Sequence, residues 1–165
     1  MAEQPYLFGS GWIRVKDGNP TGMSLFLRHY TARQRRKVYQ FVGPGDKEVY
    51  LTVDAKALFV WRKFISDAGE TGANCAVFRN EGSSAGKSSD LIYSACKMAW
   101  ERWPGERLYT YVWPEKLHTV KRWGREMCPW PPGRCFIEAG FVKCGETKDG
   151  KHILELLPEA SSSKS

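Results

Sequence analysis

The sequence predicts an α/β fold in which a mixed central sheet is flanked by helices, and three observations support this. The 165 residues, 42% of them hydrophobic, suffice for one ordinary core and are few for two. One stretch, from Ser88 to Trp103, repeats apolar residues every three or four positions, as an amphipathic helix does. Short β-branched and aromatic runs lie on both sides of it, and this alternation is typical of α/β domains.

The first half of the chain predicts a strand, a helix and three neighbouring strands. The helix begins after Asn19-Pro20, and the turn residues Asp54, Ala55 and Lys56 separate two of the strands as a hairpin. These segments are, in order, 11–15, 21–30, 49–53, 57–64 and 75–79.

The second half begins with the clearest helix, which Ser88 or Ser89 can cap and which Pro104-Gly105 ends. A strand at 108–112, a short helix at 134–139 and hairpin strands at 141–144 and 152–156 follow. We expect one domain over residues 1–158. The Ser-rich stretch 159–165 has no large apolar residue that could offset its ordering entropy, so we expect a disordered tail.

The composition narrows the class of protein and of partner. A formal net charge of +7 favours polyanions, either nucleic acid or the phosphates of coenzyme A. The five cysteines form no C-x-x-C pair and follow no signal segment, which indicates a cytoplasmic protein with reduced thiols. The three histidines match no zinc spacing, so we expect no metal site. No run of about 18 apolar residues is present, so we expect no membrane span.

A polar segment, 79–88, joins the strand at 75–79 to the main helix. Its small residues would let main-chain N–H groups approach an anion at the helix N-terminus, which predicts a pyrophosphate cradle. The alternative is a polar loop that merely begins a helix. A nucleotide-binding P-loop is excluded, because the pattern G-x-x-x-x-G-K-S requires glycine where this chain has Glu81.

Here the sequence resembles the GNAT superfamily of N-acetyltransferases. That family's phosphate loop reads Gln or Arg, two residues, Gly, one residue, then Gly or Ala, and Arg79, Gly82 and Ser84 follow it with Ser in the last place. About 50 residues later, Cys135 to Phe141 is similar to the family's late helix and turn, commonly Y-x-x-x-G-F. The order of elements from Gly11 to Leu157 is also similar.

The resemblance implies a cofactor, acetyl-CoA or another acyl-CoA, in a V-shaped cleft between the strands at 75–78 and 108–112. Main-chain groups near Val77 and Phe78 would bind pantetheine. Phe136 would contact the cofactor, but it stands where many family members have a tyrosine that protonates the leaving thiolate, and it cannot do so. Tyr109 or Tyr111 would substitute, or the thiolate would leave unassisted, since a thiol pKa of about 8.5 makes a fair leaving group. The pyrophosphate would contact Arg79, Gly82, Ser83, Ser84, Ala85, Gly86 and Lys87.

Two basic stretches bear on the acyl acceptor. The first lies at and beyond the end of the first predicted helix, and the resemblance implies that it borders the acceptor site. The second is a long Pro-rich loop from Trp113 to Arg134, whose cations and indoles suit phosphate neutralisation and base stacking. A solvated basic loop and packing tryptophans are the alternatives. The acceptor-binding candidates are Tyr30, Arg33, Arg35, Arg36, Lys37, Trp61, Trp113, Lys121, Arg122, Trp123 and Arg125.

The segment His29 to Arg33 resembles the H-Y-x-x-R segment of the Mom-like proteins of transposable phages, which modify adenine in phage DNA. The leading hypothesis is therefore acylation of a base amine in DNA, with the base displaced from its stack. His29 and Tyr111 are the candidate acid or base residues. An N-acetyltransferase acting on a small amine or a protein terminus, and a non-catalytic nucleic-acid-binding protein, are the alternatives.

Overall fold

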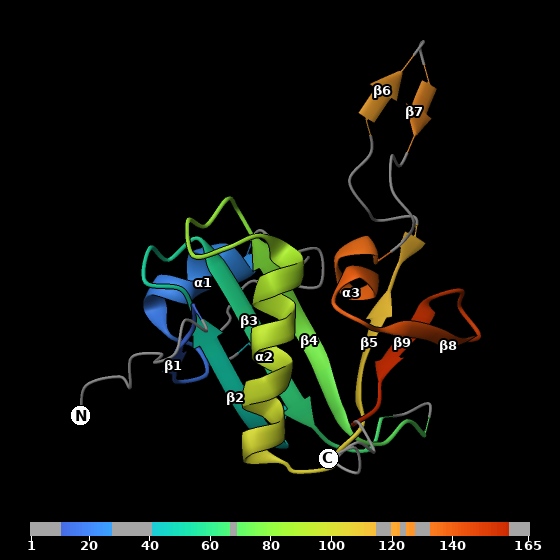
Figure 1. Cartoon of the computed structure of the whole chain (residues 1–165), viewed down its shortest axis with the longest axis horizontal. Helices are drawn as coiled ribbons and strands as arrows, with labels where there is room; N and C mark the ends of the chain where they lie inside the picture. The colour runs from blue at the N-terminus through green and yellow to red at the C-terminus, as the bar shows by residue number, and fades with distance from the viewer. Residues whose placement is uncertain are drawn as a thin grey trace, which may run out of the picture.

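The computed structural model describes residues 11–27, 41–66, 69–114, 120–122, 125–127 and 133–158, with only the backbone at 120–122 and 125–127. It has the predicted class: a seven-stranded mixed sheet with helices on both faces (Figure 1). The strand order is β1-β2-β3-β4-β5-β9-β8. The bounds are β1 Ile13–Val15, β2 Asp46–Leu51, β3 Ala57–Lys63, β4 Ala73–Asn80, β5 Leu108–Val112, β8 Val142–Glu146 and β9 His152–Leu156.

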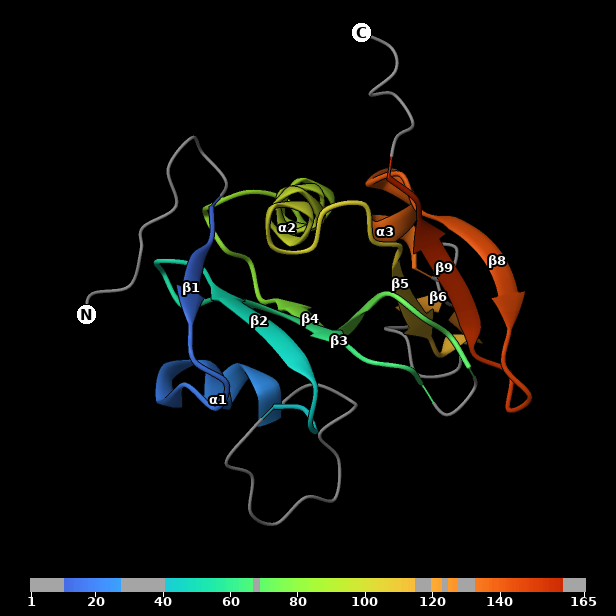
Figure 2. The ribbon, with the colours of Figure 1, turned by 90° about the horizontal axis from the view of Figure 1, so that it is seen from below.

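Neighbouring strands of this sheet are antiparallel, apart from β4 and β5, which are parallel. A parallel pair requires a crossover connection, and α2 (Ser88–Arg102) supplies it. Figure 2 shows α2 and α3 (Arg134–Glu138) on one face of the sheet and α1 (Pro20–Leu27) on the other.

Two indoles hold α2 against the sheet. Trp12 Nε1 donates to the carbonyl oxygen of Leu91 at 2.8 Å, and Trp61 Nε1 donates to that of Ala95 at 3.0 Å. Both side chains are fully buried. For Trp61 the sequence left two roles open, contact with the acyl acceptor or packing in the core. The structure shows the core residue, because its strand turns that side chain toward α2.

The opposite face of β2, β3 and β4 has a second apolar cluster under α1. Leu25 and Phe26 of the helix pack there with Phe41, and Val60 and Val77 contribute from the strands. The two clusters explain why β3 is apolar at every position from Ala57 to Trp61: both of its faces are covered.

The structure corrects several sequence-based expectations. The expected cap, Ser88 or Ser89, lies inside the main helix: Lys87 occupies the N-cap position without a side-chain cap, and the Ser88 hydroxyl accepts from Asn80 Nδ2 at 3.1 Å. The expectation of a loop throughout 113–134 is wrong in part, since β6 (Val120–Arg122) and β7 (Arg125–Met127) form an antiparallel hairpin. Its strands are three residues long and mostly charged in sequence, so they lack the alternating apolar pattern that predicts a strand. No helix of the described residues is long and apolar enough to cross a membrane.

Candidate functional site

The parallel pair β4 and β5 is joined over only part of its length. Three residue pairs match, the last being Cys75 with Thr110, although β4 continues to Asn80 and β5 to Val112. The pairing of β4 with β3 shifts register at the same level, between Val60 and Trp61, which marks a β-bulge. Beyond this level the two strands diverge toward the loop that begins α2 (Figure 1).

The hydrogen-bond register decides which main-chain groups face the diverging edge. The Glu81 N–H donates to the Lys56 carbonyl at 2.7 Å, so Glu81 faces β3. Strand residues alternate in direction, so Val77 also faces β3, whereas the N–H and C=O groups of Phe78 face the β5 side. Of the two residues expected to bind pantetheine through the main chain, Phe78 alone has that orientation.

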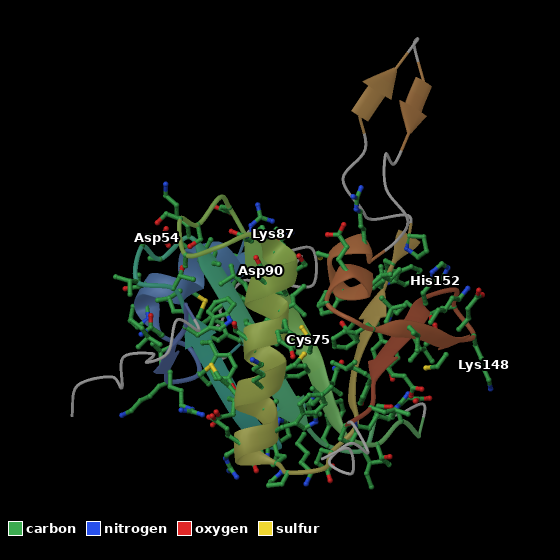
Figure 3. The ribbon with its side chains drawn as sticks, in the orientation of Figure 1. Asp54, Cys75, Lys87, Asp90, Lys148 and His152 are labelled. Atoms are coloured by element: carbon green, nitrogen blue, oxygen red, sulfur yellow. The ribbon has the colours of Figure 1, made fainter. Side chains whose placement is uncertain are left out.

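Aromatic side chains pack beside this edge on the α2 face. The Phe136 ring lies edge-on to Phe78, with centroids 6.0 Å apart, and to Phe141, at 5.2 Å. Phe136 is 7% exposed, which makes it a packing residue. Cys75 lies in the same region (Figure 3), and burial raises the pKa of its thiol well above the ordinary value, so it is an inert thiol.

The loop before α2 receives its acceptors from within the protein. Asn80 Oδ1 accepts from the N–H groups of Gly82 and Ser83 at 3.1 and 2.9 Å. The Asp54 carboxylate accepts from the Ser84 N–H at 2.8 Å and from the hydroxyls of Ser83 and Ser84 at 2.9 and 3.2 Å. The acceptor at the middle of the expected anion cradle is therefore a carboxylate of this chain.

Asp54 was read from sequence only as a turn residue, and it lies about 30 positions before the serines that it binds. Although its carboxyl group is largely solvated, its pKa is lowered, because hydrogen bonds from Ser84, Thr52 and Ser83 outweigh desolvation. The N–H of Ala85 donates to Ser83 Oγ at 3.1 Å. In Figure 3, Asp54 and Lys87 both lie at the N-terminal end of α2.

The remaining loop residues begin the helix. Lys87 precedes its first turn with an exposed side chain, and Gly86 is half-buried beside it. Arg79, expected to contact pyrophosphate, forms an ion pair with Glu81 through Nε and Oε2 at 2.5 Å. The main-chain groups from Gly86 onward are thus the part of the cradle best placed to meet an outside anion.

Tyr109 and Tyr111 project from the other face of β5, away from α2. The Tyr111 hydroxyl donates to Ser66 Oγ at 3.1 Å, and Tyr111 is half-buried. The Tyr109 hydroxyl is fully buried, and burial raises its pKa to about 12. Of the two substitutes for the missing family tyrosine, Tyr111 alone has both partial exposure and a hydrogen bond.

Trp113 follows β5 on the same face and is half-buried, with Lys151 Nζ 5.2 Å from its ring centroid. Lys121, Arg122 and Arg125 lie in the β6–β7 hairpin, of which only the backbone is described. The candidates that fall outside the described residues are His29, Tyr30, Arg33, Arg35, Arg36, Lys37 and Trp123.

Within the described ranges, no cluster of three or more His, Cys, Asp or Glu side chains could hold a metal ion. No family model matches the chain, and no curated protein matches it.

Proposed function

We propose that the chain is an acyl-CoA-dependent N-acyltransferase with a GNAT-like sheet, and that its acceptor is a base amine in DNA. The observation that carries the proposal is the β4–β5 pair, parallel for three residue pairs and then diverging toward the loop before α2. A bulge in the pairing of β4 and the outward main chain of Phe78 support the same proposal. In it, the V-shaped cleft between β4 and β5 receives an extended amide-bearing arm that adds to the edge of β4.

When bound, acyl-CoA supplies an acyl carbon whose leaving group is a thiol of pKa about 8.5. The main chain of Phe78 would hold the pantetheine amide, and the main-chain groups from Gly86 onward, with Lys87, would hold phosphate. Attack by the amine forms the C–N bond and breaks the C–S bond. The proton lost by the amine goes to a base, for which His29 is the candidate. The thiolate either takes a proton from Tyr111, the candidate acid, or leaves unassisted, since Phe136 has no proton to donate.

The net charge of +7 and the basic, indole-bearing segments support nucleic acid as the acceptor. An acetyltransferase for a small amine or a protein terminus shares the same cofactor site and differs only at the acceptor. One observation favours a further candidate, a non-catalytic nucleic-acid-binding protein: Asp54 and Asn80 already accept from the loop amides that the cofactor would need.

Calorimetry with acetyl-CoA separates an acyltransferase from the non-catalytic binding protein. Gly82→Asp adds a carboxylate to the loop and should abolish binding. Gly105→Asp is the matched control, since Gly105 also has a positive φ (77°, against 87° for Gly82) and open space around it, but lies beyond the other end of α2. The control should retain binding, and both variants should be equally strained.

Equal affinity in Gly82→Asp and the original protein would refute the proposed cofactor site. If the unmodified protein neither binds acetyl-CoA nor gains thermal stability from it, the non-catalytic reading replaces the acyltransferase.

A further inference from the structure

On the face of β5 and β9 away from α2, three rings and two cations form a row along the sheet. Arg107 lies over the Tyr109 ring at 4.8 Å, and the rings of Tyr109 and Tyr111 meet edge to face at 5.6 Å. Lys151 Nζ then lies 5.7 Å from the Tyr111 centroid and 5.2 Å from that of Trp113. We call Tyr111, Trp113 and Lys151 the aromatic strip.

The two cations of this row, Arg107 and Lys151, differ in how closely they are paired with carboxylates. Arg107 forms ion pairs with Glu70 at 2.8 Å and Glu155 at 2.6 Å, so its guanidinium is already engaged. The carboxylate that pairs with Lys151 is Asp149, at 3.7 Å, and the lysine side chain is 31% exposed. An ammonium group has three hydrogen-bond donors, so Lys151 can bind an added anion and keep its long ion pair with Asp149.

The helices leave the strip accessible and its surroundings polar. α1, the described helix on this side of the sheet, contacts β3 and β4 (Figure 2). Beside the strip, two buried polar atoms have no hydrogen-bond partner among the described residues: the Tyr109 hydroxyl and Asn74 Oδ1. These two residues are neighbours in the β4–β5 register, and each such atom costs about 1 to 3 kcal/mol unless something satisfies it.

We propose that the aromatic strip binds one nucleotide unit of a nucleic-acid chain, with the base stacked on the Trp113 ring and the phosphate paired with Lys151. A nucleotide joins a planar π-face to an anion within a few ångströms, and the strip offers the complementary pair at 5.2 Å. The net charge of +7 favours a polyanion, and an acidic peptide rarely combines a planar ring with an anion at this spacing.

The position of the strip ties it to the acceptor, and this part of the inference rests on the proposed function. Pairing of β4 with β5 ends at Thr110, and Tyr111 is the next residue. A base stacked on Trp113, beside Tyr111, would therefore border the place where the two strands diverge, from the face away from α2. Binding of the nucleotide itself does not depend on acyl-CoA.

The test is titration of the full chain with a fluorescently labelled single-stranded DNA of about ten nucleotides, without acyl-CoA, over a range of salt concentrations. Three variants are compared: Trp113→Ala, Lys151→Met and Lys148→Met. Lys148 is an exposed lysine of the same β8–β9 turn and serves as the charge-matched control (Figure 3). Thermal unfolding of each variant checks that the fold is retained.

Trp113→Ala should weaken binding between about 5-fold and 100-fold with little change in salt dependence. Lys151→Met should make the slope of log affinity against log salt shallower by about 0.7, the value for one contact to a single strand, and Lys148→Met should leave it unchanged. Equal effects of the two lysine variants, no effect of Trp113→Ala in a folded protein, or tighter binding of an acidic peptide would overturn the site. Failure of the original protein to bind acetyl-CoA would instead refute the acyltransferase and leave this measurement standing.

Discussion

The Tyr109 hydroxyl is the residue-scale feature with the clearest energetic consequence. It is fully buried and makes no well-formed hydrogen bond in the part of the chain that the structure describes. The Ser66 hydroxyl lies near enough to affect its pKa, but Ser66 accepts its hydrogen bond from Tyr111. Its neighbour Tyr111 shows the contrast, because the hydroxyl two positions along the strand reaches Ser66. A buried donor without a partner loses the hydrogen bonds that water gave it in the unfolded chain.

Tyr109→Phe should therefore stabilise the protein, by about 1 kcal/mol, which corresponds to a rise of roughly 2 to 4 °C in Tm for a chain of this size. The gain should widen at alkaline pH. The raised pKa of Tyr109, about 12, means that the unfolded chain loses this proton near pH 10 while the folded protein keeps it, so stability falls between these values only when the tyrosine is present.

Thermal unfolding of both proteins at pH 7, and urea unfolding between pH 9 and about 11, would check this. Tyr111→Phe is the matched control and should destabilise, because it removes one of the two hydrogen bonds that Ser66 Oγ accepts, the other coming from the Glu70 N–H. A loss of stability in Tyr109→Phe at pH 7 would show that the hydroxyl has a partner in solution.

At the scale of elements, the parallel pairing of β4 with β5 depends on one close approach of backbone to backbone. The Ala73 N–H donates to the Arg107 carbonyl at 2.8 Å, just before the first residue pair of the two strands. A Cβ on Gly72 would lie 2.3 Å from that carbonyl oxygen, and Gly72 has a φ of +114°. Glycine is therefore required where β4 begins.

Gly72→Ala should destabilise the fold by about 3 to 5 kcal/mol, since backbone must move in addition to adopting a strained φ. Gly69→Ala, in the same connection, has a φ of +85° but no atom within 4 Å of the added Cβ, so it should cost only about 1 kcal/mol. Denaturant unfolding of both variants measures the difference in stability. Failure of Gly72→Ala to fold, with Gly69→Ala folded, is also the expected outcome. A similar loss of unfolding free energy in the two variants would show that β4 and β5 can move apart slightly without destabilising the fold.

At the scale of the whole molecule, the charge of +7 is divided between stretches of different character. Several described cations are engaged in ion pairs, such as Arg107 with Glu70 and Glu155, and Arg102 with Asp46. Between Asp17 and Asp46 the sequence has no acidic residue, and its cations cluster at 28–37. That stretch is where an excess of positive charge is least compensated along the chain.

Replacing Arg35, Arg36 and Lys37 with Ser should make the slope of log DNA affinity against log salt shallower by up to roughly two or three units, with little change in sequence preference. Fluorescence anisotropy at several salt concentrations measures the slope. The control for net charge alone is a second triple variant, in which Ser replaces Lys63, Lys97 and Lys143 and three positive charges are also removed. Equal slopes in the two triple variants would mean that the cluster makes no specific contact.

The order and class of the elements followed from the sequence alone. Strands at 108–112 and 152–156 and the helix from Ser88 have the predicted bounds or begin where predicted, because hydrophobic period and flanking Gly and Pro act over a few residues. The same local signals missed the β6–β7 hairpin, whose strands are three residues long and mostly charged in sequence.

Other features were decided only by the tertiary structure. Alternation showed that Trp61 faces one side of its strand, but packing of α2 determined that this side is the core. The contact of Asp54 with Ser84 and that of Tyr111 with Ser66 join residues about 30 and 45 positions apart. Such contacts depend on the register and packing of whole strands, which local periodicity does not encode, and they determine which groups of the candidate site are engaged and which remain available.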